Sequence, residues 1–299
     1  PQIVFGNMPN DGGNLLFTEE EKEEFLKLEP KADKYIKPLI SAKEYLNGKN
    51  RYCLWLKDCP PNELKAMPKV LERVENIKKL RSESNREATK KLAKTPMLFG
   101  EDRQPSGDYV FIPRVSSENR LYVPMAFFTQ DFICGDTGLA VPNATLYHFG
   151  ILTSKMHMDW MRYVCGRLKS DYRYSNEIVY NNFPWPTPTE QQKAKIEQTA
   201  QAILDARALY PDSSLADLYD DLTMPPELRK AGDMGHLRHL GHAHRVHHQG
   251  EVPVRQDGGH GLDDPGGKQL HHRFFLGRGH ARMQQADHDA RQHLAQILM

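Results

Sequence analysis

The stretch YVFIPRVSSENRLYV, residues 109–123, places two apolar runs on either side of a polar loop. Both runs are rich in β-branched and aromatic residues, which favour strands. We therefore predict strands over residues 109–112 and 121–123, with the loop 113–120 between them. Further short apolar runs follow at residues 126–128, 132–134 and 139–141. This part of the chain is expected to be rich in strands.

Helical signals lie on both sides of the strand-rich part. Thr18 and Glu21 have the spacing of a capping box, which predicts a helix that ends near Leu28. Thr189 precedes a second amphipathic segment, which ends near Leu209. Other helices are predicted over residues 68–93 and 148–167 and near Pro225, and a strand is predicted over residues 51–56. We therefore predict an α+β fold in which a mixed α/β domain is followed by a helical segment.

The composition excludes several classes of protein. The 299 residues include 40 Lys and Arg against 39 Asp and Glu, a net charge of +1, which excludes a uniformly polybasic coat for nucleic acid but not a local basic face. No run of 18 apolar residues could span a membrane. Residues 1–5 show neither an initiator Met nor a signal sequence, so we expect a piece from the middle of a longer chain. The four cysteines lack CxxC spacing, which predicts free thiols in a cytoplasmic protein.

The composition changes after Lys230. Twelve of the 14 His follow it, and residues 231–299 contain no Ser, Thr, Asn, Tyr, Trp or Cys. A His-rich metal-binding tail and a natural disordered tail are two interpretations. The third is a frameshift product, since translation in a wrong frame yields a biased sequence unrelated to any selected fold. We expect this aberrant, low-complexity His/Gly-rich tail to be irregular or disordered.

Motifs that would indicate catalysis are absent. The sequence has no GxSxG, HExxH, EF-hand loop, paired-Cys zinc pattern or phosphate-binding glycine loop, so the glycine-rich residues 6–13 are interpreted as a turn. Residues 181–184 (NNFP) and 58–61 (DCPP) only approach the Asn/Asp-Pro-Pro-aromatic motif of amino-methylating DNA enzymes. His148 and His157 lack a third metal ligand and are expected in the core or at a helix cap. The chain by itself is therefore not expected to catalyse methyl transfer.

Residue types suited to DNA recognition gather in two loops and one helix. Arg matches guanine, Asn matches adenine, and Ser, Tyr and Lys bind phosphates or base edges. The predicted contacts are Arg114, Ser116, Ser117, Asn119 and Arg120 in the first loop, and Arg167, Lys169, Ser170, Tyr172, Arg173 and Tyr174 in the second. Lys90 and Lys91 belong to a basic helical surface, which also includes Arg81, and are predicted to bind phosphates. The alternative is an ordinary solvated helix and two polar surface loops with internal salt bridges to Glu118 and Asp171.

Several long strings of the sequence resemble one family. They are residues 4–13 (VFGNMPNDGG), 50–56 (NRYCLWL), 113–120 (PRVSSENR), 143–154, 166–175 (GRLKSDYRYS) and 180–186 (YNNFPWP). They are similar to the part of MmeI-like, type IIL restriction–modification enzymes that follows the methyltransferase domain. The similarity covers about residues 1–230. The family continues past a Lys-Ala-His-like segment, whereas this chain has Lys230-Ala231-Gly232, which favours the frameshift interpretation.

The resemblance implies a division of labour within a longer parent protein. Residues 1–186 would form a DNA target recognition domain, residues 187–230 a C-terminal helical segment, and residues 231–299 the aberrant tail. The parent would be an adenine-specific N6 DNA methyltransferase, with or without endonuclease activity, that uses S-adenosylmethionine and, for cleavage, magnesium. The expected partners are double-stranded DNA and the parent's methyltransferase and nuclease domains, with no cofactor in this piece. The alternative function is a subunit-docking module formed by the helices from Thr189 onward.

Overall fold

The computed structural model of the protein describes residues 1–234, which belong to one compact unit. Helices and several sheets occur together in this unit, which confirms the α+β fold class. No helix among these residues is long and apolar enough to cross a membrane. The tail interpreted as a frameshift product lies outside the described residues from Gly235 onward. Residues 231–234, which the composition assigned to that tail, continue the helix α10 (Pro226–Met234).

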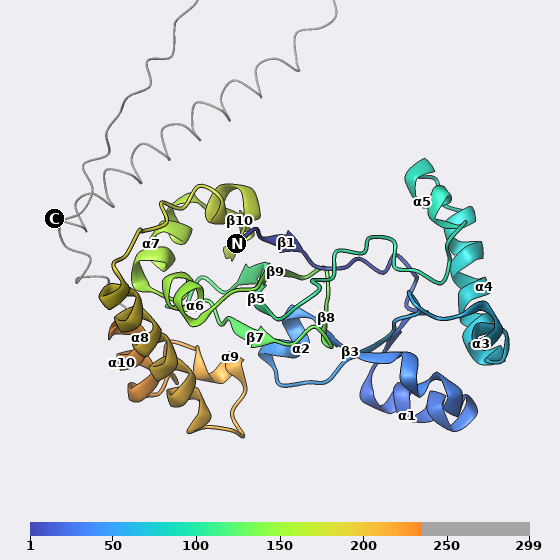
Figure 1. The fold of residues 1–299 in the computed structure, drawn as a ribbon, viewed down its shortest axis with the longest axis horizontal. Coiled ribbons are helices and arrows are strands. Elements are labelled where there is room, and N and C mark those ends of the chain that lie inside the picture. The colour runs from blue at the N-terminus through green and yellow to red at the C-terminus, as the bar shows by residue number, and fades with distance from the viewer. Residues whose placement is uncertain (235–299) are drawn as a thin grey trace, which may run out of the picture. The chain divides into compact units, whose positions relative to one another are not determined.

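The central sheet is antiparallel, with the strand order β1 (Val4–Phe5), β9 (Gly138–Pro142), β5 (Tyr109–Pro113) and β7 (Ala126–Phe128) (Figure 1). β5 is buried along its whole length, as its continuous apolar run predicts. The strand predicted over residues 121–123 is wrong. There the N–H of Val123 donates to Sδ of Met158 at 3.3 Å, and the hydroxyl of Tyr122 donates to Asp233 at 2.6 Å. This segment therefore packs against helices, and β5 pairs with β7 and β9.

A second sheet has the order β2 (Leu16–Phe17), β4 (Tyr52–Leu54), β3 (Ile36–Ile40) and β8 (Ile133–Cys134). Its strands share a hydrophobic core with α1 (Glu19–Leu28), the short 3-10 helix η1 (Pro30–Tyr35) and α4 (Pro68–Ser82). The short helices α2 (Ala42–Leu46) and α3 (Pro61–Lys65) connect these elements. α1 begins at the predicted capping box of Thr18 and Glu21, which confirms that helix.

The helix predicted over residues 68–93 is two helices, because α4 ends at Ser82 and α5 (Glu87–Leu92) begins after a break. Arg81, predicted on the basic surface, is fully buried. Its guanidinium donates at 2.8–3.1 Å to five backbone carbonyls, those of Pro9, Asn10, Leu92, Thr95 and Leu98. A continuous helix would carry Leu92 roughly 16 Å along the axis from Arg81. The chain must turn back after Ser82 so that these carbonyls can satisfy the buried charge.

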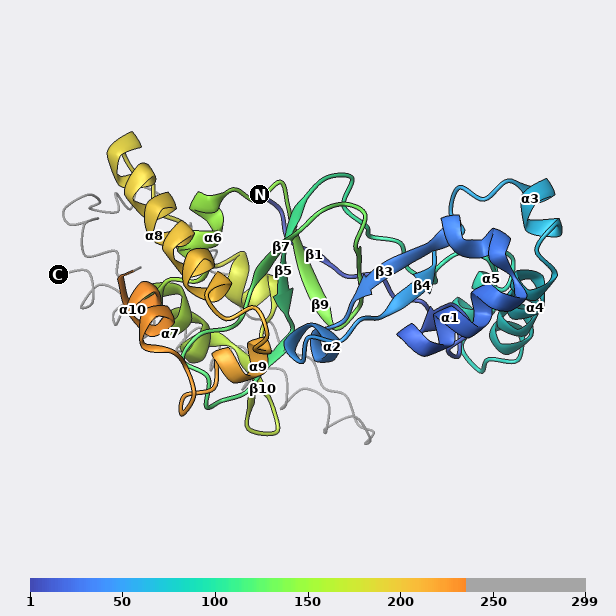
Figure 2. The ribbon, with the colours of Figure 1, turned by 90° about the horizontal axis from the view of Figure 1, so that it is seen from below.

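The helix predicted over residues 148–167 is also divided, into α6 (Leu146–Leu152) and α7 (Lys155–Val164). Ser154 begins α7 as its N-cap, since its hydroxyl accepts the N–H of His157 at 3.2 Å. The helix predicted from Thr189 is confirmed as α8 (Glu190–Ala208), which is followed by α9 (Leu215–Leu218) and α10. These helices lie beside the central sheet, whereas α1, α3, α4 and α5 gather at the other end of the unit (Figure 2).

The two histidines lie where a core or cap role was predicted. Nδ1 of His148 accepts the N–H of Thr145 at 3.1 Å, at the start of α6. His157 is fully buried in α7, where its Nε2 shares a hydrogen bond of 2.8 Å with the hydroxyl of Tyr174. This interpretation is confirmed for both residues.

Candidate nucleic-acid interface

The two loops predicted to recognise DNA meet in one antiparallel sheet of β10 (Gly166–Leu168), β11 (Asp171–Arg173) and β6 (Val115–Ser116). β10 and β11 form a hairpin with Lys169 and Ser170 at its tip, and β11 pairs with β6. The second region is therefore a projecting hairpin, labelled at β10 in Figure 2, and not the irregular loop that was predicted. A two-stranded β-ribbon of this kind fits the major groove of B-DNA.

The pairing register divides the hairpin into two faces, because directly paired residues of an antiparallel sheet share a face. Arg167, Tyr172 and Ser116 lie on the inner face, where Tyr172 and Ser116 are buried. Arg173 lies on the opposite, outer face, which also carries Leu168 and Asp171. The outer face therefore presents a cation, a carboxylate and an apolar side chain.

The outer face and the tip have the groups that base recognition needs. Arg173 is exposed, and its guanidinium makes no hydrogen bond or ion pair with another described residue. A guanidinium in this state can donate two hydrogen bonds to guanine, and the carboxylate of Asp171 can accept one from the amino group of cytosine. Lys169 and Ser170 at the tip are both exposed. They are placed to contact the flanking phosphates.

The inner face supports the hairpin. The guanidinium of Arg167 lies 4.0 Å from the ring centre of Tyr172 and donates to the carbonyl of Ser170 at 2.8 Å. Tyr174, which follows β11, is buried and bonded to His157. Burial raises the pKa of the Tyr174 hydroxyl and lowers that of His157 to about 3, so both are neutral near pH 7.

These placements correct part of the predicted contact set. Ser116, Tyr172 and Tyr174 were predicted to contact DNA, yet each is at most 9% exposed. Their side chains pack beneath the hairpin because the alternation of a strand turns every second residue inward. The structure therefore gives them a supporting position, whereas Lys169, Ser170 and Arg173 remain accessible.

The first loop is held in place by its own arginine. Nη1 of Arg114 donates to the carbonyl of Asp136 at 2.9 Å, and the guanidinium lies 5.0 Å from the ring centre of Phe5. Its tip is more open: Asn119 is exposed, and its N–H donates to the hydroxyl of Ser117 at 3.3 Å. Asn119 is thus the residue of this loop best placed to contact a base.

Arg120 connects the two loops electrostatically. Burial lowers the pKa of its guanidinium, and the carboxylates of Asp220 and Asp171 partly oppose that shift. Nε of Arg120 is buried without a hydrogen-bond partner. Within residues 1–234, no ion pair joins Glu118 or Asp171 to these loops. The internal salt bridges of the alternative interpretation are therefore absent from this part of the chain.

The two lysines predicted to bind phosphates lie on α5. Both are exposed, but Lys90 forms an ion pair of 2.8 Å with Glu87 one turn earlier. Lys91 makes no ion pair with another described residue. Arg81 positions this helix through hydrogen bonds from its buried guanidinium to the carbonyl of Leu92 and to those of Thr95 and Leu98, which follow the helix. Lys91 is therefore the stronger candidate for a phosphate contact.

Sequence reasoning missed the outer-face residues Leu168 and Asp171 and the role of Arg81. The alternation of Tyr172, Arg173 and Tyr174 is a strand signal that could have indicated the two faces. No local signal could have indicated the burial of Arg81, because its partners Pro9 and Asn10 lie more than 70 residues earlier in the chain.

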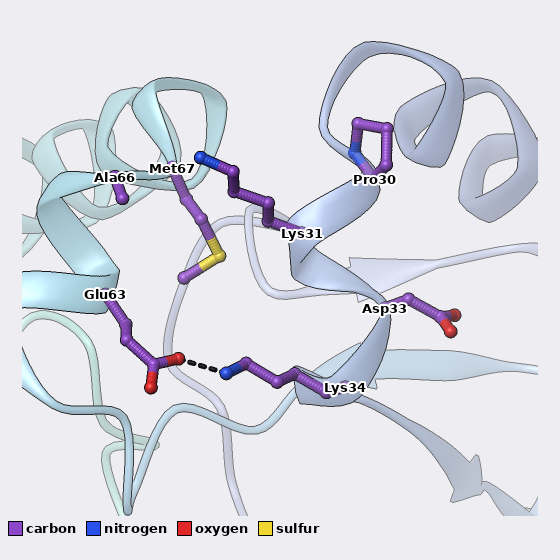
Figure 3. A pocket seen from close by; sticks show the side chains of 7 residues that line it. All are labelled: Pro30, Lys31, Asp33, Lys34, Glu63, Ala66 and Met67. Atoms are coloured by element: carbon purple, nitrogen blue, oxygen red, sulfur yellow. Dashed lines mark ion pairs between the residues drawn. The ribbon is translucent and has the colours of Figure 1, made fainter.

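An open pocket of about 380 Å³ lies elsewhere, between η1 and α3 (Figure 3). Its lining residues are Pro30, Lys31, Asp33, Lys34, Glu63, Ala66 and Met67. The carboxylate of Glu63 is already paired with Lys34 and accepts the hydroxyl of Tyr35 at 2.6 Å. These contacts lower the pKa of Glu63, so it remains charged. None of the predicted DNA contacts lines this pocket.

Comparisons with known proteins indicate one family. The model of the MmeI target recognition domain matches residues 1–187, and that of the MmeI C-terminal domain matches residues 188–235. DNA methyltransferase A of Bacillus subtilis (strain 168) is 42% identical over 231 residues, which are 77% of this chain and 26% of the relative. The solved type IIL restriction-modification enzyme MmeI, in complex with DNA, is 45% identical, with a TM-score of 0.78 over 79% of this chain and 31% of that one. The chain thus spans about a quarter to a third of their lengths.

Proposed function

Because this chain belongs to the MmeI family, of which it contains the target recognition domain and part of the C-terminal domain, we propose that it recognises a short sequence in double-stranded DNA. It would do so for a restriction–modification enzyme that also methylates DNA. The observation that carries the proposal is the outer face of the β10–β11 hairpin, where Arg173 is exposed and unpaired beside the carboxylate of Asp171. Recognition of this kind needs donors and acceptors at the edge of a ribbon that enters the major groove.

Phosphate contacts would fix the position of the hairpin on the duplex. Lys91 on α5 and Lys169 at the hairpin tip are exposed cations on separate elements, so they can bind the DNA backbone at separate points. The net charge of the whole chain is only +1, which is consistent with local and not uniform attraction to DNA. Specificity would then come from the hairpin and the tip of the first loop.

The remaining steps are assigned to the longer parent protein. We propose that its methyltransferase domain modifies the N6 amino group of adenine, and that S-adenosylmethionine bound there supplies the methyl group. The described residues contain no group of three or more His, Cys, Asp or Glu side chains that could hold a metal ion, so we assign no magnesium to them. Residues 1–234 would bind and orient DNA, in the cytoplasm, for chemistry performed by the other domains.

The competing proposal, a subunit-docking module, has less support. It requires a free apolar face on the helices after Thr189. In α8 that face is already buried within the unit, and its buried residues are Ile196, Ala200, Ile203 and Ala206. α8 packs on α6 and α10 of the same chain. The apolar stripe of α8 is therefore already covered by other elements of the described unit and is not available to another subunit.

Binding of the full chain to a pool of randomised DNA duplexes at two salt concentrations tests the proposal. We expect one short sequence to be enriched and the affinity to fall as salt rises, because phosphate contacts release counterions. Salt-dependent binding without enrichment would show that sequence recognition needs the rest of the parent. Binding at neither salt concentration would contradict DNA recognition and favour the docking module.

A further inference from the structure

The end of β10, next to the hairpin tip, has an apolar side chain to which the proposed function gives no role. Leu168, the last residue of β10, is 52% exposed. It lies on the outer face, directly paired with Asp171 and opposite to the inner face that packs on the unit. A single exposed leucine is common on protein surfaces, so its exposure alone indicates nothing. Its surroundings distinguish it.

Leu168 lies among cations that suit DNA. Lys169 follows it at the tip, and Arg173 lies on the same outer face one step along the paired strand, whereas Arg167 lies on the inner face. Leu168 is thus an exposed apolar side chain beside the carboxylate of Asp171, with which it is paired, and near the cations Lys169 and Arg173. This places it to be the apolar contact within an interface in which those cations bind an anionic partner.

The backbone of the next residue strengthens this argument. Lys169 has φ of 56°, in the left-handed region that favours glycine or asparagine at a two-residue hairpin turn. A lysine in this conformation is strained, and such strain persists where the surrounding structure or the function requires it. The turn therefore holds a cation at the tip, immediately after Leu168, whose place on the outer face is set by the pairing of β10 with β11.

On the basis of the proposed function, we propose that Leu168 contacts the 5-methyl group of a thymine in the major groove. The thymine methyl is the apolar feature of the base edges in that groove, and small apolar side chains contact it. The width of a two-stranded ribbon fits the same groove. Arg173 on the same face would contact a base nearby, and Lys169 a flanking phosphate. Leu168 is thus a specificity-determining residue that distinguishes thymine from the other bases by its methyl group.

Uracil substitution tests this contact, because uracil pairs as thymine does but lacks the methyl group. The full chain is first selected on randomised duplexes, and each thymine of the enriched sequence is then replaced by uracil in turn. We expect one position at which the wild-type chain loses about 3- to 5-fold in affinity, the effect of one buried methyl-sized group. Leu168→Ala should bind the thymine duplex with a similar loss and show no further loss on the uracil duplex.

Leu28→Ala is the matched control, since Leu28 is 69% exposed on α1, outside the hairpin. It should keep the full effect of uracil. The methyl contact is overturned if no uracil position weakens the wild-type chain, or if Leu168→Ala retains the wild-type loss at that position. A Leu168→Ala variant that loses sequence preference without any uracil effect would indicate a wedge between base steps and would also overturn it. Absence of any enriched sequence would overturn the proposed function itself, a separate result.

Discussion

Arginines of the candidate interface differ in whether their guanidinium groups already have partners in the protein. Arg114 lies between β5 and β6, Arg173 lies on β11, which pairs with β6, and both were predicted to contact DNA. The guanidinium of Arg114 is bonded to the carbonyl of Asp136 and lies against Phe5, whereas that of Arg173 has no partner among the described residues. The guanidinium of Arg114 therefore supports the fold, whereas that of Arg173 is an available donor.

Substitution of the two arginines should separate these positions. Arg173→Ala is expected to lower discrimination at one base pair by about 1–3 kcal/mol, with little change in stability, because it removes a bidentate contact. Arg114→Ala should instead lower the free energy of unfolding by about 1–2 kcal/mol, because it leaves a charged hydrogen bond unmade. Selection on randomised duplexes measures the first effect and urea denaturation the second. Equal loss of base preference in both variants would contradict the division.

His157 predicts a pH dependence of stability. Burial lowers its pKa to about 3 in the folded protein, against an ordinary value of about 6.5 when unfolded. The unfolded chain thus binds the proton first, so stability is full above pH 6.5 and is lost as the pH falls toward 3.

Comparison of the wild-type chain with His157→Gln measures this dependence. Between pH 7 and pH 5 the wild-type chain should lose about 1–2 kcal/mol more unfolding free energy than the variant. Urea denaturation of both chains at pH 7, 6 and 5 isolates His157, because all other titrating groups are shared. Parallel pH profiles would show that His157 titrates normally and that its burial has no energetic consequence.

At the scale of elements, the register of the small sheet decides which residues are accessible. Residues 166–175 contain Arg, Lys, Tyr and Ser throughout, but the pairing of β11 with β10 and β6 turns Tyr172 inward and Arg173 outward. A shift of one residue would exchange the two faces. The orientation of α5 also depends on distant contacts. It is set by hydrogen bonds from the buried guanidinium of Arg81 to the carbonyls of Leu92, Thr95 and Leu98.

The lysines of α5 should affect affinity and not sequence preference. Lys91→Ala is expected to weaken binding to all sequences alike and to reduce the slope of log affinity against log salt by about 0.9, the value for one phosphate that is no longer neutralised. Lys90→Ala should act in the same direction but less, because Glu87 already pairs with Lys90. Glu87→Ala is the matched control and should strengthen binding by freeing Lys90. A changed preferred sequence in Lys91→Ala would show that α5 contacts bases.

At the scale of the whole molecule, the recognition part and the C-terminal helices interlock. α6 packs on α8, Nη1 of Arg207 donates to the carbonyl of Met125 at 2.6 Å, and Tyr122 bonds to Asp233. The division between residues 186 and 187 into two domains stays a prediction. Within the described residues, both sides of that division contribute to one compact unit, so neither is expected to be stable alone.

Gly150 tests this interlocking. A Cβ at Gly150 in α6 would lie 2.8 Å from Cγ2 and 3.0 Å from the carbonyl oxygen of Ile196 in α8, so Gly150→Ala must push the helices apart. We expect it to lower the unfolding free energy by about 1–3 kcal/mol, more than the gain in helix propensity offsets. Gly166→Ala is the control, since a Cβ there meets no atom within 4 Å. Equal stability of the two variants would show that α6 and α8 can separate at no cost.

The sequence by itself determined the features that depend on neighbouring residues. The capping box at Thr18, the N-cap at Thr189, the continuous apolar run of β5 and the long strings shared with the MmeI family are all local, so these helices, the central strand and the family could be predicted. The two long helices were predicted as continuous although local signals mark both breaks, Ser84 and Asn85 at the first and the N-cap residue Ser154 at the second.

Only the tertiary structure decided which residues of the candidate interface are accessible. The burial of Arg81 depends on carbonyls more than 70 residues away, and the orientation of Leu168 and Arg173 depends on pairing between β10, β11 and β6. The side chain of Tyr174 is removed from the surface by His157, which lies on another element. Propensity and capping act within a few residues of the chain, whereas burial and strand register are set by contacts between distant segments. Composition could therefore indicate the region proposed to recognise DNA, and the packing of the unit determined which of its side chains are accessible.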